Sequence, residues 1–295
     1  MKKILLANPR GFCSGVFRAI QMVEKALETF GAPIYVKHKI VHNRHVIHGL
    51  QEKGAIFIED LQDVPEGSSI VYSAHGVSPS VRFEAKKRNL VEIDATCGLV
   101  KKIHEAVKLY DKQGYKILLI GHENHIEIQG IRDEVSHPVF IISSVEDIST
   151  IPFSSSDKIF YATQTTFNVE KEREIVKELE KIFPFLETLE KSSICFATLL
   201  RQKALQVIAK QSDLILIIGD PSSSNSRRLL EVALSFQSHS YLINGPDEMD
   251  KDWVDRASCI GISAGASTPE WVLEKCVNTL KKWGVEEVEE FFYQA

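Results

Sequence analysis

Three of the five cysteines occur in settings that suit metal ligation. Cys13 lies in Gly-Phe-Cys-Ser-Gly, Cys97 in Asp-Ala-Thr-Cys-Gly, and Cys195 in Ser-Ile-Cys-Phe-Ala-Thr. The glycines beside Cys13 allow the backbone to approach a bound group closely. Thiolates are preferred ligands of zinc and of iron–sulfur clusters. Because about one of these cysteines falls in each third of the chain, a threefold fold would allow a shared metal site, but spacing alone favours the alternative of three buried apolar thiols.

The other two cysteines are predicted to be buried thiols without a chemical role. Cys259 falls in an apolar run of strand type, and Cys276 falls in the helical pattern of residues 270–282. An odd number of cysteines in a reducing compartment also argues against a disulfide framework.

Histidines and short polar side chains recur in loops that follow predicted strands. Such groups, together with a helix N-terminus, suit the binding of phosphate oxygens. Each also has an ordinary alternative, because Ser-Ser-Asn before a helix is commonly a cap and a lone histidine is commonly structural. The candidate anion-binding residues are His42, His75, His125, Ser223, Ser224, Asn225 and Ser267. Six other histidines, at positions 38, 45, 48, 104, 122 and 137, are interpreted as structural or surface residues.

Glu127 is the candidate proton carrier, because it follows His125 by two residues. A carboxyl group in a partly desolvated site can hold a proton near neutral pH. Thr165 is expected to form a hydrogen bond with the same group. The alternative for Glu127 is a solvated carboxylate at the start of a helix. The chain has no P-loop and no Gly-x-Gly-x-x-Gly motif, which argues against a nucleotide cofactor.

The elements that must position these residues follow a threefold pattern. Apolar runs at residues 3–9, 116–121 and 214–219 each lead into a polar loop and a helical pattern. A second set of runs covers residues 69–76, 158–166 and 259–267, and each is preceded by another strand and an acidic turn. Apolar strands that lack polar alternation are typical of sheets covered on both faces. The alternative is a chance recurrence of ordinary α/β sequence.

The pattern predicts an α/β fold of three small domains with parallel-type sheets around a pseudo-threefold axis, which would bring the three cysteines to that axis. The predicted units are residues 1–97, 98–194 and 195–285, followed by a C-terminal tail at 286–295 that either packs or acts as a lid. Ligands of such sheets bind beyond the carboxyl ends of the strands. All the candidate residues occur there.

Composition limits the classes of function. The chain has 295 residues, a net charge of -5 and no basic stretch, so nucleic-acid binding is not expected. The apolar run at residues 4–7 is too short for a signal peptide, and no segment has transmembrane length. We therefore expect a cytoplasmic protein without a membrane partner.

Eight motifs of this chain, in order and between about residue 3 and residue 284, resemble those of the 4-hydroxy-3-methylbut-2-enyl diphosphate reductase family, the last enzyme of the non-mevalonate isoprenoid pathway. They are Asn8-Pro-Arg-Gly-Phe-Cys-Ser-Gly15, Val41-His-Asn-Arg44, Ser73-Ala-His-Gly-Val77, Asp94-Ala-Thr-Cys97, Gly121-His-x-x-His-x-Glu127, Thr163-Gln-Thr-Thr166, Ser223-Ser-Asn-Ser226 and Ser263-Ala-Gly-Ala-Ser267.

The resemblance implies a role for each candidate residue. It implies one 4Fe–4S cluster with Cys13, Cys97 and Cys195 as ligands, and a diphosphate site made by the anion-binding residues named above. Thr165 matches the position that contacts the substrate hydroxyl, and Glu127 matches the proton relay. The implied reaction converts the allylic diphosphate to isopentenyl and dimethylallyl diphosphate. The implied partners are this substrate and a ferredoxin- or flavodoxin-type electron donor, and the family suggests a monomer.

Some flanking residues depart from the family pattern. Gly98 and Lys101 stand where proline and threonine are usual, and Leu199 and Leu200 stand where polar residues are frequent. These departures leave every implied ligand in place. Two other functions remain open at this point, an iron–sulfur sensor without turnover and a zinc-dependent phosphoester hydrolase that uses the same thiols.

Overall fold

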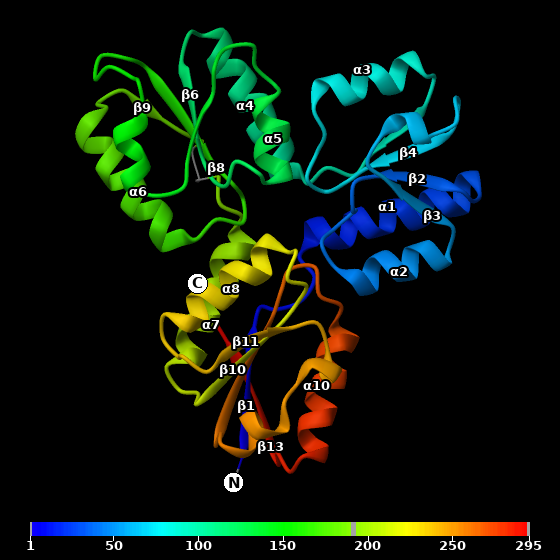
Figure 1. The fold of residues 1–295 in the computed structure, drawn as a ribbon, viewed down its shortest axis with the longest axis vertical. Helices are drawn as coiled ribbons and strands as arrows, with labels where there is room; N and C mark the ends of the chain where they lie inside the picture. The colour runs from blue at the N-terminus through cyan, green and yellow to red at the C-terminus, as the bar shows by residue number, and fades with distance from the viewer. Residues whose placement is uncertain (1, 190–192, 294–295) are drawn as a thin grey trace. The chain divides into compact units, whose positions relative to one another are not determined.

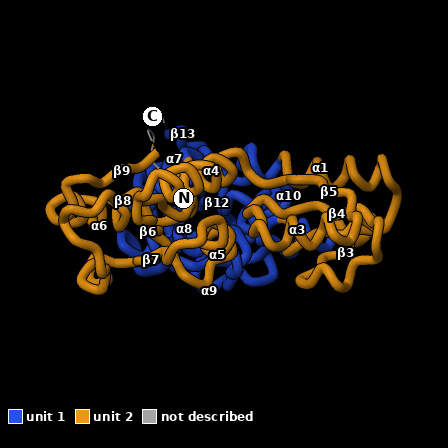
Figure 2. The backbone as a smooth tube through the Cα atoms, turned by 90° about the horizontal axis from the view of Figure 1, so that it is seen from above, with its two compact units in different colours: residues 1–17, 41–48, 196–295 blue, residues 18–40, 49–195 orange. Residues whose placement is uncertain are grey.

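The computed structural model describes residues 2–189 and 193–293. Three separate sheets form within this part of the chain, and every pair of hydrogen-bonded neighbours is parallel (Figure 1). The predicted fold class, three α/β units with parallel sheets, is therefore confirmed. The chain divides into two compact units, unit 1 with residues 1–17, 41–48 and 196–295, and unit 2 with residues 18–40 and 49–195 (Figure 2).

Unit 1 contains a five-stranded sheet with the order β11-β10-β12-β1-β13. Its strands are β1 (Lys3–Asn8), β10 (Leu214–Ile218), β11 (Ser240–Ile243), β12 (Cys259–Ala264) and β13 (Glu287–Phe292). Its helices are α7 (Phe196–Ala209), α8 (Ser224–Leu234), the short α9 (Lys251–Asp255) and α10 (Glu270–Lys282), with a 3-10 turn at Pro246–Glu248.

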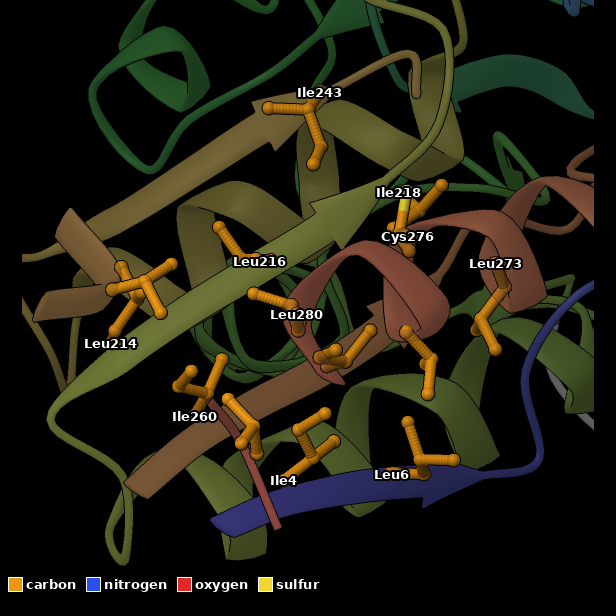
Figure 3. Packing of buried hydrophobic residues seen from close by; sticks show 14 of the residues in the cluster. Ile4, Leu6, Leu214, Leu216, Ile218, Ile243, Ile260, Leu273, Cys276 and Leu280 are labelled. Atoms are coloured by element: carbon orange, nitrogen blue, oxygen red, sulfur yellow. The ribbon is translucent and has the colours of Figure 1, made fainter. Parts of the chain in front are cut away.

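The central strand β10 explains why the sequence shows no polar alternation here. Leu214, Leu216 and Ile218 pack in one buried cluster with residues of α10, including Cys276 and Leu280 (Figure 3). The alternate side chains of β10 pack in a second cluster with residues of α7 and α8. Both faces of the strand are therefore apolar, as expected of a parallel sheet covered by helices on both sides.

Unit 2 contains two four-stranded sheets. The first has the order β3-β2-β4-β5 and consists of β2 (Ile34–Lys37), β3 (Ala55–Ile58), β4 (Ser69–Tyr72) and β5 (Val91–Asp94). The second has the order β7-β6-β8-β9 and consists of β6 (Lys116–Ile120), β7 (Phe140–Ile142), β8 (Ile159–Thr163) and β9 (Leu186–Glu187). The helices of unit 2 are α3 (Pro79–Lys87), α4 (Gly98–Lys112), α5 (Ile126–Arg132) and α6 (Val169–Ile182). Two further helices, α1 (Ser14–Phe30) and α2 (Arg44–Glu52), have residues in both units. Two 3-10 turns, Leu61–Asp63 and Glu146–Thr150, occupy the predicted acidic turns.

The three sheets share one strand order, which corrects the predicted repeat. The orders β3-β2-β4-β5, β7-β6-β8-β9 and β11-β10-β12-β1 correspond strand for strand. The prediction equated residues 3–9 with residues 116–121 and 214–219, but β1 is the fourth strand of the unit 1 sheet, and β2 is the counterpart of β6 and β10. The reason is long-range pairing, because β1 hydrogen-bonds with β12 on one side and β13 on the other.

The termini differ from the predicted units for the same reason. The predicted first unit began at residue 1, yet β1 belongs to the sheet built mainly from residues 214–264. The tail was predicted at residues 286–295, of which the structure describes 286–293. This part packs against the unit 1 sheet, because β13 runs parallel to β1 from Lys3↔Glu287 to Asn8↔Phe292. No helix in the described ranges has both the length and the apolar content that crossing a bilayer requires.

Candidate active site

The candidate residues follow equivalent strands in all three sheets. The loops after β2, β6 and β10 carry His42, His125 and the run Ser223–Asn225, and the loops after β4, β8 and β12 carry His75, Thr165 and Ser267. The three cysteines follow the fourth strands, with Cys13 after β1, Cys97 after β5 and Cys195 after β9. The carboxyl ends of parallel strands share one edge of a sheet, so these loops begin where ligands of α/β sheets bind.

Glu127 and Thr165 form a buried pair in unit 2. The Glu127 side chain is only 2% exposed. The backbone N–H of Thr165 donates to one carboxyl oxygen at 2.6 Å, and its Oγ1 lies 2.7 Å from the other. Burial raises the pKa of Glu127 above its ordinary value, although the hydrogen bonds from Thr165 act in the opposite direction. The predicted Glu127–Thr165 hydrogen bond is confirmed, and the alternative of a solvated Glu127 is wrong.

His125 and His75 lie beside this pair. His125 is the N-cap of α5, and its Nδ1 accepts a hydrogen bond from the Glu127 N–H at 3.2 Å. That acceptor role leaves Nε2 as the ring nitrogen that carries the proton in the neutral imidazole. The His75 and His125 rings meet edge to face, with centroids 6.2 Å apart. Unit 2 thus brings together two proposed anion ligands and the proposed proton carrier.

The two cysteines of unit 2 are held by backbone hydrogen bonds to neighbouring site loops. The Cys97 N–H donates to the carbonyl of Ala74, the residue before His75, at 3.0 Å. The Cys195 N–H donates to the Thr165 carbonyl at 2.9 Å. Both thiols are partly exposed. The backbone at Cys97 is therefore tied to the loop that carries His75, and the backbone at Cys195 to the loop that carries Thr165.

Asp94 fixes the start of the Cys97 loop. Its carboxylate accepts a hydrogen bond from the Thr96 N–H at 3.0 Å and pairs with Arg82 at 3.1 Å and Lys101 at 2.9 Å. Burial opposes ionisation of Asp94, but these hydrogen bonds and charges outweigh it and hold its pKa well below the ordinary value. Lys101, a departure from the family pattern, therefore adds an ion pair beside the cysteine.

Cys13, in unit 1, lies in a loop held by two contacts. Its N–H donates to the Ala266 carbonyl at 3.1 Å, next to Ser267. Its Sγ lies 3.4 Å from the N–H of Val16 in the first turn of α1. Hydrogen bonds to ligand sulfur are one means by which proteins tune thiolate-bound clusters.

The candidate anion-binding residues of unit 1 include three at the N-terminus of α8. Ser223 is the N-cap, with its Oγ 3.4 Å from the Ser226 N–H, and Asn225 Oδ1 accepts from the Ala266 N–H at 2.9 Å. The Ser267 hydroxyl donates to the His42 carbonyl at 2.8 Å. Ser223, Ser224, Asn225 and Ser267 are each at most 5% exposed. The cap interpretation and the anion-site interpretation therefore apply to the same residues.

The remaining two cysteines are buried, as predicted. Cys259 is 8% exposed in β12, and Cys276 is fully buried in α10. Burial raises the pKa of both thiols, for Cys276 to about 12. Within each unit, the described residues contain no group of three His, Cys, Asp or Glu side chains arranged to hold a metal ion. The shared three-cysteine site stays a prediction.

Two supporting residues, Asn43 and Arg201, were missed from the sequence. Asn43 Oδ1 caps α2 by accepting from the His45 N–H at 3.0 Å, a role that its place just before the helix indicates. The buried Arg201 donates to the Gly11 carbonyl at 2.7 Å in the Cys13 loop, which no sequence signal indicates. His104, interpreted as structural, is buried with Nδ1 2.6 Å from Glu134.

Comparison with known proteins shows the family of this chain. Residues 4–281 match the family described as LytB protein. The chain belongs to the LytB family. Its relatives in that family include the 4-hydroxy-3-methylbut-2-enyl diphosphate reductase of Protochlamydia amoebophila, 56% identical over 291 residues that cover 99% of this chain and 93% of the relative. The protein of the same name from Chlamydia pneumoniae is 54% identical and covers 95% of this chain and 90% of its own length.

Solved structures of LytB-type reductases agree. The chain is similar, with a TM-score of 0.97 and 43% identity, to the E-1-hydroxy-2-methyl-but-2-enyl-4-diphosphate reductase from Plasmodium falciparum, with 100% of this chain and 93% of that chain covered. A structure of (E)-4-hydroxy-3-methyl-but-2-enyl diphosphate reductase, described as the terminal enzyme of the non-mevalonate pathway, gives a TM-score of 0.68 at 31% identity and covers 96% of this chain. The resemblance found from the sequence motifs is confirmed.

Proposed function

We propose that this LytB-family chain is an oxidoreductase that converts 4-hydroxy-3-methylbut-2-enyl diphosphate to isopentenyl and dimethylallyl diphosphate. The buried Glu127–Thr165 pair carries the proposal, because it places a buried carboxyl group next to His125, whose ring contacts that of His75. The names of relatives that match nearly the whole chain support the choice of substrate. The overall change adds two electrons and two protons, breaks the allylic C–O bond and releases water.

The residues present fit a 4Fe–4S cluster. Cys13, Cys97 and Cys195 are partly exposed thiols in equivalent loops, whereas Cys259 and Cys276 are buried thiols with raised pKa values. Deprotonated thiols are the ligands that iron–sulfur clusters require. When bound, the cluster would supply the electrons of the reduction and Lewis acidity toward the leaving hydroxyl. A ferredoxin- or flavodoxin-type protein is the proposed electron donor to a monomeric, cytoplasmic enzyme.

The diphosphate group is assigned to His42, His75, His125, Ser223, Ser224, Asn225 and Ser267. Asn225 shows why these groups suit an anion. Its Oδ1 is held by the Ala266 N–H, and its buried Nδ2 has no hydrogen-bond partner among the described residues. A buried donor without an acceptor is costly, and a phosphate oxygen would satisfy it. These residues would position the allylic chain and so lower the entropic part of the barrier.

Glu127 is the proposed proton source for the departing hydroxyl. Burial raises its pKa and so shifts its ionisation equilibrium toward the protonated form. A hydroxyl can accept one hydrogen bond while donating another, so Thr165 Oγ1 can receive the proton of Glu127 as it passes its own to the substrate oxygen. The second proton is added to either of two carbons of the allylic fragment, which gives the two products.

The test is substrate-dependent oxidation of a reduced one-electron dye by anaerobically purified protein. We expect oxidation coupled to formation of both five-carbon diphosphates. Brown, iron-loaded protein that does not oxidise the dye would contradict the proposal and indicate an iron–sulfur sensor. Colourless, zinc-loaded protein that releases phosphate would contradict it in favour of a hydrolase.

A further inference from the structure

Two glycines face each other at the ends of adjacent strands in unit 1. Gly219 follows β10 and Gly265 follows β12, and the Gly265 N–H donates to the Ile218 carbonyl at 2.9 Å. Neither glycine has a positive φ. An alanine at either position is therefore compatible with the backbone conformation, and its effect depends only on the space around the added methyl group.

Ser226 fills the space that a side chain on either glycine would need. An ideal Cβ at Gly219 would lie 2.3 Å from Ser226 Oγ and 2.9 Å from its Cβ. An ideal Cβ at Gly265 would also lie 2.3 Å from that Oγ, but 3.5 Å from its Cβ. Ser226 is fully buried. Its hydroxyl is thus wedged between the two strand ends, in a place that only glycine at both positions leaves open.

Ser226 belongs to the first turn of α8, next to the residues assigned to the anion. Its N–H faces the Oγ of the N-cap Ser223 at 3.4 Å, and its neighbour Asn225 is held by Ala266, which follows Gly265. The buried, unpartnered Nδ2 of Asn225 is an independent sign that this turn receives a ligand with acceptor oxygens. Any shift of Ser226 would move the turn that carries Ser224 and Asn225.

We propose that Ser226, seated against Gly219 and Gly265, is a positioning residue that sets the first turn of α8 for the diphosphate group. The inference rests on the proposed function, since it concerns the same anion site. Overpacking at this point shifts backbone as well as side chains. The two glycines therefore contribute to the anion site indirectly, because their lack of side chains leaves room for Ser226. Neither glycine is expected to contact the ligand.

The experiment measures the Kd of inorganic diphosphate by calorimetry on iron-loaded protein. Gly265→Ala places a methyl group against the Ser226 hydroxyl, and we expect the Kd to rise at least about tenfold, equal to 1.4 kcal/mol. Ser226→Ala removes the wedge and should raise the Kd about threefold. In Ser226→Ala/Gly265→Ala the new methyl fills the vacated space, since 3.5 Å to Cβ is ordinary contact and only Thr268 Oγ1, at 3.3 Å, must adjust. The double variant should therefore bind within about threefold of wild type, a clear departure from additivity.

Two matched variants sharpen the test. Ser226→Ala/Gly219→Ala should not recover binding, because 2.9 Å still separates the two Cβ positions. Gly49→Ala, in α2, places its methyl where no atom lies within 4 Å and should bind as wild type. Wild-type affinity in Gly265→Ala, or a double variant no better than Gly265→Ala, would overturn the proposal.

Hydrogen exchange separates this inference from the proposed function. If wild-type protein does not bind diphosphate, the proposed assignment of the anion site is wrong. The amide of Arg227, which donates to the Ser223 carbonyl at 3.0 Å, would still report the position of the turn. Exchange of this amide should be faster in Gly265→Ala and return to the wild-type rate in Ser226→Ala/Gly265→Ala. An unchanged exchange rate in Gly265→Ala would refute the claim that packing of Ser226 against the two glycines positions the first turn of α8.

Discussion

Glu127→Gln separates the chemical role of the buried carboxyl from its structural role. Glutamine has the same shape, so its Oε1 can keep the hydrogen bond from the Thr165 N–H at 2.6 Å. Its amide can donate to Thr165 Oγ1, which lies 2.7 Å from the second carboxyl oxygen, because a hydroxyl rotates to accept. Both contacts survive, and we expect the free energy of unfolding at pH 5 to change by less than about 1 kcal/mol.

Turnover should respond quite differently. Proton transfer by a positioned acid contributes about 10²–10⁴-fold to a rate, and glutamine cannot supply that proton. We therefore expect kcat to fall by about 10²-fold or more, with an unchanged Kd for inorganic diphosphate and unchanged iron content. The assay is dye oxidation coupled to analysis of both products. A kcat within about threefold of wild type in fully iron-loaded Glu127→Gln would refute the relay role.

The same substitution predicts a change in the pH dependence of stability. Burial raises the folded-state pKa of Glu127 above its ordinary value of 4.5, so the folded protein binds the proton more tightly than the unfolded chain. This contribution to stability is complete below about pH 4.5 and is lost as the pH rises through the folded-state pKa. Denaturant unfolding should thus show wild type losing stability relative to Glu127→Gln as the pH rises. A stability difference that does not vary with pH would contradict the raised pKa.

Three further predictions test other parts of the site. His42→Ala should raise KM for the allylic diphosphate with a smaller effect on kcat, and an unchanged KM would remove His42 from the anion site. Asn43→Ala deletes the α2 cap and should lower the free energy of unfolding by about 1 kcal/mol in denaturant titrations, whereas an unchanged value would show that the cap is dispensable. Cys13→Ala should lose bound iron and Cys276→Ala should retain it, as measured by iron content per chain; iron loss in the second variant alone would reverse the ligand assignment.

The sequence by itself predicted most of the buried strands and the chemistry of the loops, although β2, β5, β9 and β13 were not predicted. Continuous apolar runs such as residues 214–218 predict a strand buried on both faces, and both faces of β10 are covered. The eight motifs, among them those that contain Cys13 and Cys97, identified the family because their residue types and order are local features. Asn43 could have been found the same way, since a cap is read from the residues just before a helix.

Only the tertiary structure decided what depends on contacts between distant segments. β1 pairs with β12, more than two hundred residues later, and no local pattern records that partner. The burial of Glu127 comes from packing against the Thr165 loop, and burial is what raises its pKa. The wedge of Ser226 between Gly219 and Gly265 exists only because two strand ends and a helix meet there. The sequence determines which chemical groups are available and how far apart they lie along the chain. Their pKa values and the space around their side chains depend on which segments lie next to them, and that is decided only when the chain folds.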